Sequence, residues 1–180
     1  MQDSQIRFFP LAVKTVVCHS VTYFLMGILA YNFLNYQAVI DQPCSGMRPV
    51  TSMWVMMGPM LQIFRGLLFA SVFYLFRERL FAHKHGWARM AWVLIGIGIL
   101  GTFAAPAGSL EGFIYTTTPI RFQIRGYLEV VPQALLTSAL LYFWVNRPGK
   151  KWITWSLSAA YVAIVLLPLL GVLAQHMQKR

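Results

Sequence analysis

Residues 53–76 read MWVMMGPMLQIFRGLLFASVFYLF, an apolar run that carries one charged residue, Arg65, close to its midpoint. A helix needs about 20 mostly apolar residues to cross the hydrocarbon core of a bilayer. The run is long enough for this, and it lacks the alternation of polar and apolar residues that marks a transmembrane β-strand. It therefore predicts a membrane-spanning helix, and the charge at its centre becomes the main clue to function.

Further apolar runs of this kind lie at about 11–33, 90–107, 119–145 and 152–174. We therefore expect an all-α integral membrane protein, a bundle of five transmembrane helices with short loops. The connectors leave no room for a second domain, so residues 1–180 are expected to form a single transmembrane domain. The run at 90–107 is the shortest, which leaves a protein of four spans as the alternative.

The composition supports a location in the membrane. The chain of 180 residues is 58% hydrophobic and 11% charged, whereas about 25% of the residues of a soluble domain are charged. Its formal charge is +10, but the basic residues gather between the apolar runs, which is typical of loops that face anionic lipid head groups. We expect the lipid bilayer, and no nucleic acid, as the partner. The composition is typical of small bacterial inner-membrane proteins, so a multi-pass location in the cell membrane is expected.

The distribution of Lys and Arg predicts the orientation, because cytoplasmic loops carry an excess of both. With the N-terminus inside and the C-terminus outside, most basic residues fall on the inner side. The inner set is Arg7, Lys14, Arg77, Arg79, Lys84, Arg89, Arg147, Lys150 and Lys151, and the outer set is Arg48, Arg121, Arg125, Lys179 and Arg180.

Arg65 needs a polar partner within the membrane. A charge at the centre of a span costs about 3 kcal/mol on insertion scales. Glu129 is the acidic residue that lies within an apolar run, and Gln133 follows it by one helical turn on the same face. We predict that the Arg65 guanidinium faces the fourth span and contacts Gln133 or, through a water molecule, Glu129.

The fourth span contains more polar side chains at a spacing of four residues. It is expected to begin near residue 119, with Thr118 as its cap and Pro119 in the first helical position. We therefore expect these side chains, with those of span two, to line an outward-opening, positively charged cleft between spans two and four. The planar guanidinium groups of its arginines would suit a phosphate, a carboxylate or a lipid head group. The predicted ligand-binding residues are Gln62, Arg65, Arg121, Arg125, Glu129 and Gln133.

Three classes of function fit this cleft. The first is binding or transport of an anionic or lipidic ligand; at 20.5 kDa the chain is small for a complete transporter, so a homo-oligomer or a larger membrane complex would be needed. The second is a structural or accessory subunit, in which the polar residues only hold helices together. The third is an enzyme that acts on a lipid phosphate, with the arginines holding the anion and Glu129 as acid or base.

No pattern indicates a metal or another cofactor, and we expect none. Cys18 lies in the first run and Cys44 in a loop, at depths that do not favour a disulfide. His19 has no second histidine at a matching depth that would complete a haem site, so it is expected to bond to a neighbouring helix. No Ser-His-Asp arrangement appears, and a role without catalysis is favoured.

Overall fold

The computed structural model describes residues 6–34, 48, 52–103 and 105–178, and their regular secondary structure is entirely helical. The helices are α1 (Phe8–Phe33), α3 (Met53–Met56), α4 (Gly58–Leu75), α5 (Arg77–Phe81), α6 (Gly86–Ile95), the π-helix η1 (Gly96–Leu100), α7 (Leu110–Tyr115), α8 (Ile120–Asn146) and α9 (Lys151–Gln178). The predicted all-helical class is thus confirmed for the described residues. Four helices, α1, α4, α8 and α9, are long and apolar enough to cross a membrane, and α6 with η1 forms a shorter apolar helix.

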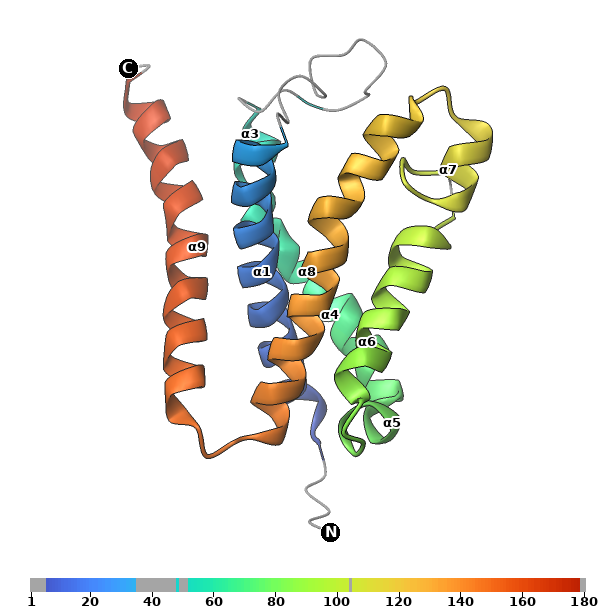
Figure 1. The fold of residues 1–180 in the computed structure, drawn as a ribbon. Coiled ribbons are helices and arrows are strands. Elements are labelled where there is room, and N and C mark those ends of the chain that lie inside the picture. Colours follow the sequence, from blue (N-terminus) through green and yellow to red (C-terminus); the bar gives the residue numbers. More distant parts are fainter. Residues whose placement is uncertain (1–5, 35–47, 49–51, 104, 179–180) are drawn as a thin grey trace.

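The long helices run side by side along a common direction (Figure 1). The start of α1, the short helix α5 and the turn between α8 and α9 lie at one end, which we call the basic end; α3 and α7 lie at the other, which we call the far end. Helix α6 and η1 run from the basic end to the far end beside α8. Helix α1 is central, because it packs against α4, α8 and α9, whereas α6 packs against α8.

The second and third apolar runs differ in detail from the predicted spans. The run 53–76 is divided at Met57 into α3 and α4, and Pro59 occupies the first turn of α4, where its missing amide hydrogen costs no helical hydrogen bond. The run 90–107 begins earlier, at Gly86, and ends at Leu100. Its last residues form a connector, in which Gly108 adopts a left-handed conformation with φ of 87°.

Helix α8 begins at Ile120, as the prolines and threonines before it predicted, but the predicted cap is wrong. Pro119 occupies the N-cap position, and no side chain caps the helix. Thr118 instead offers its backbone oxygen to the side-chain amide of Gln123, at 2.9 Å. The extended backbone of Pro119, with ψ of 134°, carries the chain from this contact into the helix.

Small side chains let α1 approach its neighbours closely. Cys18 and Ser20 are completely buried in α1. Gly66 of α4 faces Val16 of α1, and a methyl group added to this glycine would lie 2.8 Å from the Val16 Cα atom. Between membrane helices, where the hydrophobic effect adds little, such close packing supplies much of the association energy.

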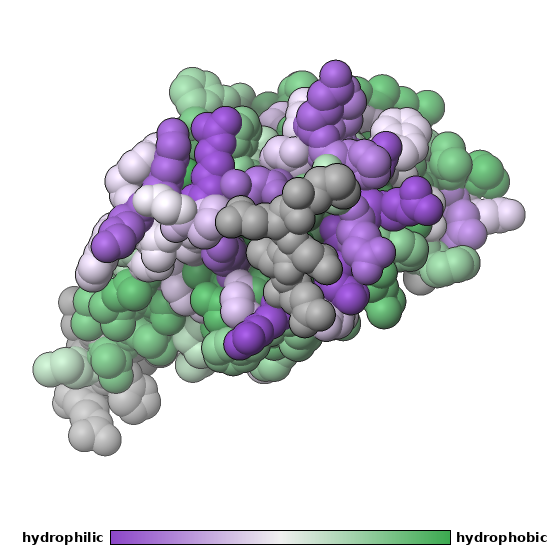
Figure 2. All heavy atoms as spheres, turned by 90° about the horizontal axis from the view of Figure 1, so that it is seen from below, coloured by the Kyte–Doolittle hydropathy of each residue, from purple (hydrophilic) through white to green (hydrophobic). Residues whose placement is uncertain are grey.

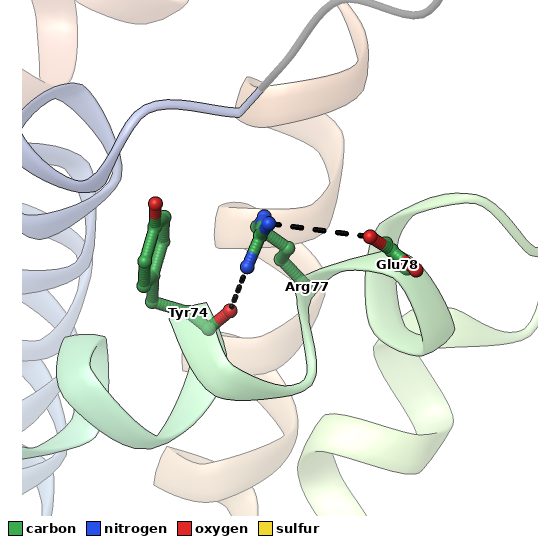
Figure 3. A network of polar contacts seen from close by, with 3 residues as sticks. All are labelled: Tyr74, Arg77 and Glu78. Carbon is green, nitrogen blue, oxygen red and sulfur yellow. Dashed lines mark hydrogen bonds and ion pairs between the residues drawn. The ribbon is translucent and has the colours of Figure 1, made fainter.

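The basic end is polar and well connected. Hydrophilic side chains gather on this face of the molecule (Figure 2). The Lys14 ammonium group donates to the Trp144 backbone oxygen at 3.2 Å, which ties α1 to the end of α8. Arg77 donates to the Tyr74 backbone oxygen at 3.1 Å, at the C-terminal end of α4, where a positive charge is favourable (Figure 3). Its contact with the exposed Glu78, at 4.0 Å, adds little because water screens it.

We predict that Gly66→Ala destabilises the bundle by about 1–3 kcal/mol, the usual cost of overpacking. The new methyl group would meet the backbone of Val16, which cannot turn aside as a flexible side chain would. The measurement is the free energy of unfolding in mixed micelles, followed by tryptophan fluorescence during titration with sodium dodecyl sulfate.

Gly27→Ala is the matched control, because a methyl group at Gly27 in α1 has nothing within 4 Å. This variant should be as stable as the wild type or slightly more stable, since alanine favours a helix over glycine. Equal stability of the two variants would contradict the close packing of α1 on α4.

Candidate functional site

A cavity of about 300 Å³ lies at mid-height in the bundle, beside the central α1–α8 pair. Helix α1 contributes His19, α4 contributes Arg65 and Phe69, and α8 contributes Gln133 and Thr137. The opposite wall comes from the end of α6, from η1 and from the connector that follows η1. The cavity therefore brings together the central arginine of the second apolar run and polar side chains of the first and fourth.

Arg65 lies where the cavity meets the outer surface of α4. Its side chain is exposed, lines the cavity, and places its guanidinium carbon 5.6 Å from the centre of the Phe69 ring. An arginine over an aromatic face gains some cation–π stabilisation, but this does not replace the hydrogen bonds that its five donors require. The guanidinium group is therefore available to an acceptor in the cavity.

His19 holds α1 to α4 beside the arginine. Its Nε2 atom and the Gln62 Oε1 atom form a hydrogen bond of 3.1 Å, and its ring meets the Phe69 ring edge-on with centroids 4.9 Å apart. His19 is 2% exposed. The predicted bond of His19 to a neighbouring helix is confirmed, and Gln62, a predicted ligand-binding residue, is engaged with the histidine.

Helix α8 supplies the polar floor of the cavity. Gln133 is 8% exposed and lines the cavity, and its side-chain amide has no hydrogen-bond partner among the described residues. The hydroxyl groups of Thr137 and Thr22 lie 2.6 Å apart and bond α8 to α1. Glu129, one turn from Gln133, is partly buried, and the Tyr23 hydroxyl lies within electrostatic range of both Glu129 and Arg65.

The structure separates the two outer arginines from this cavity. Arg121 and Arg125 are exposed near the far end of α8, and neither lines the cavity. The guanidinium carbon of Arg121 lies 5.0 Å from the ring centre of its neighbour Phe122. The predicted cleft is therefore represented by Arg65 and Gln133, with Gln62 and Glu129 beside them; whether any of the six residues binds a ligand stays a prediction.

Gln123 is a central residue that the sequence patterns did not single out. It is 2% exposed; its Oε1 atom accepts from the Gly108 amide at 3.0 Å, and its Nε2 atom donates to the Thr118 and Gly112 backbone oxygens at 2.9 and 3.4 Å. Tyr127, one turn on, donates to the Gly108 oxygen at 2.6 Å. These bonds fix the connector between η1 and α8 to the side of α8.

The connector matters because Thr102, Pro106 and Ala107 line the cavity on this side. The sequence feature that could have identified Gln123 is its position on the same face of the helix as Thr137. Gln123 precedes Thr137 by two heptads, and residues at that spacing share a face of a helix. Arg121 and Arg125 are each two residues away and so point to the opposite side. A polar residue in phase with a buried face is a candidate for an interior hydrogen bond.

Comparison with protein-family models gives no match, and no curated protein or solved structure is significantly similar to the chain. In the part of the chain that the structure describes, no group of three or more His, Cys, Asp and Glu side chains could hold a metal ion; Cys44 lies outside that part. The chemistry that the cavity offers is hydrogen bonding from a guanidinium group and an amide.

We predict that Gln123→Leu releases the connector. The Gly108 amide would lose its acceptor, and a hydrogen bond contributes about 1 kcal/mol net, so exchange of this amide should be about fivefold faster. The measurement is hydrogen–deuterium exchange of the protein in nanodiscs. Gln133→Leu, in the same helix and also buried, is the control and should leave the exchange of Gly108 unchanged. Unaltered protection in Gln123→Leu would refute the proposed attachment.

Proposed function

We propose that this protein is a small multi-pass membrane protein that binds an anionic ligand at Arg65, in the cavity beside α1 and α8, and that it transports this ligand as a homo-oligomer or within a larger membrane complex. The observation that carries the proposal is the exposed Arg65 guanidinium group at mid-height, which lines the same cavity as the largely buried Gln133; neither side chain has a hydrogen-bond partner among the described residues. In the middle of a bilayer, such a pair is costly unless a ligand or water satisfies it.

The charge on the cavity lining favours an anion, although Glu129 lies beside the lining. Arg65 is the charged side chain among the lining residues, and His19 already shares a hydrogen bond with Gln62. A guanidinium group presents a planar fork of donors that matches the two oxygens of a carboxylate or phosphate. Because most of the lining residues are apolar, this interaction would be stronger than at a protein surface.

A structural or accessory role is the second candidate, and the interhelical hydrogen bonds favour it. His19–Gln62 links α1 to α4, and Thr22–Thr137 links α1 to α8. If these bonds are the purpose of the polar residues, Arg65 would stabilise the bundle without a ligand. The two candidates predict different effects of removing the Arg65 charge alone. A binding role predicts a loss of ligand affinity, whereas a structural role predicts a loss of stability.

The proposed topology has five spans, with α6 and η1 as the third, and the basic end in the cytoplasm. Two observations support it. The described basic residues on the predicted inner side belong to α1, to the α5–α6 segment and to the α8–α9 turn, which share one end of the bundle. Helices α1 and α9 also begin at that end and run toward the other.

A reporter fused after Arg180 tests this topology. We expect a reporter that works only outside the cytoplasm to be active, because an odd number of spans separates the two termini. A fusion at Gly149, in the α8–α9 turn, should be inactive and serves as the control. Cytoplasmic activity after Arg180 would instead support four spans, with α6 and η1 failing to cross.

The binding proposal is tested with decyl phosphate, an anionic amphiphile that can reach the protein both from water and from the bilayer. We expect the wild type in phosphatidylcholine nanodiscs to bind it, and Arg65→Gln to bind it about tenfold more weakly or worse, since a hydrogen bond to a charged group contributes about 1.5–3 kcal/mol. Isothermal titration calorimetry measures the affinity.

Arg121→Gln is the matched control for the decyl phosphate titration, because it removes the same charge from an exposed site outside the cavity. Its affinity should equal that of the wild type. Absence of binding by the wild type, together with a loss of stability in Arg65→Gln, would favour the structural role. An equal loss of affinity in both variants would extend the site to the outer arginines.

A further inference from the structure

We infer that the anion at Arg65 is the head group of an anionic membrane lipid, which enters the cavity sideways from the bilayer, through an opening between α4 and η1. This inference rests on the proposed function, since it names the class of ligand and the route to the same site. A free anion and a lipid head group would both offer Arg65 a phosphate or carboxylate group. We infer that this group comes from a lipid in the bilayer and not from the surrounding water.

The packing of the helices leaves that side open. Helix α4 packs against α1, and α6 packs against α8, but α4 and the α6–η1 segment are not a closely packed pair. Helix α5 joins them at the basic end, and the connector after η1 closes the cavity at the far end, held to α8 by Gln123. Between α5 and the connector, no described helix packs closely against both α4 and η1. We take this flank, which in a membrane faces lipid, as the opening.

Arg65 lies at the edge of this opening. The next residues around the helix on one side, Phe64 and Leu68, are 67% and 68% exposed and belong to the surface that lipid chains would cover. On the other side Phe69, about 40° away around the helix, lines the cavity. The guanidinium group therefore stands between the bilayer and the cavity, where it meets a head group that enters from the side.

The opposite wall of the cavity leaves space because it contains a glycine, which has no side chain. Gly98 of η1 lines the cavity, and a methyl group added to it would have nothing within 4 Å. Its neighbour Ile97 is 69% exposed toward the outside of the bundle. Ile99 and Leu94 line the cavity on the same wall and offer an apolar surface to the first methylene groups of an acyl chain.

The size of the cavity suits a head group better than a whole lipid. Its volume is about 300 Å³, which is room for a group of several water molecules. A phosphate with its glycerol unit fits this space, but two acyl chains do not. The chains must therefore remain in the bilayer, beside α4 and η1, which requires the lateral opening.

The test compares lipids retained by the protein after release from nanodiscs of dioleoyl phosphatidylcholine that contain dioleoyl phosphatidic acid. Native mass spectrometry reports the bound lipid. We expect the wild type to retain phosphatidic acid in preference to phosphatidylcholine, and Arg65→Gln to lose that preference. Retention of neither lipid, with decyl phosphate still bound, would overturn the lateral entry and leave the anion site intact. Failure of phosphatidic acid and decyl phosphate alike would reject the proposed function as well.

A pair of glycine variants tests the route. Gly98→Phe places a ring in the opening and should reduce the retained phosphatidic acid about tenfold or more, the ratio that corresponds to 1.4 kcal/mol. Gly96→Phe is the matched control, since a side chain there also has nothing within 4 Å but lies outside the cavity lining. Equal retention by Gly98→Phe and the wild type, or an equal loss in both variants, would overturn the route between α4 and η1. The thermal unfolding midpoint of each variant confirms that it is folded, and Gly98→Leu replaces Gly98→Phe if the ring prevents folding.

Discussion

The absence of water from the interior of a bilayer is the constraint on which the rest of this structure depends. Each polar group at mid-height needs a partner, from the protein or from a ligand, because an unpaired group costs several kcal/mol in hydrocarbon. Two threonine hydroxyl groups of α1 follow this rule: Thr15 donates to the Leu11 oxygen at 2.8 Å, and Thr22 donates to the Cys18 oxygen at 2.9 Å. The buried Ser20 hydroxyl group, by contrast, has no hydrogen-bond partner among the described residues. Thr22 and His19 also reach across to α8 and α4, so helix α1 organises the bundle.

Close packing and polar pairing support each other at this centre. Gly66 lets α4 approach the backbone of α1 at Val16, and this approach brings Gln62, one turn earlier on α4, within reach of His19. Individually, such hydrogen bonds contribute only about 0.6 kcal/mol on average in membrane proteins. Together with the packing they fix how α4 is rotated about its axis, and that rotation directs Arg65 toward the cavity.

The cavity results from the order of the helices around this centre. With α4 on α1 and α6 on α8, none of the described long helices packs closely against both α4 and η1 along this flank. Gln123 prevents the connector from moving away, because three of its hydrogen bonds end on that segment. One cavity then combines a charged group at its edge, Arg65, with the amide of Gln133 and with a glycine on the opposite wall, Gly98. We propose that this combination would favour an anionic amphiphile as the ligand.

The sequence by itself determined the helical class and the approximate bounds of the long helices, because hydropathy is a property of short segments. The polar partner that it predicts for Arg65, Gln133 or Glu129, stays a prediction. The sequence could not determine which residues meet. His19 and Gln62 are 43 positions apart, Thr22 and Thr137 are 115 positions apart, and only the tertiary structure separates Arg121 from Arg65. The reason is physical: an apolar run does not fix how a helix is rotated or which helices surround it, since lipid accepts every apolar face equally well. Glycine contacts and a few interhelical hydrogen bonds decide these features, and they form only when the helices pack.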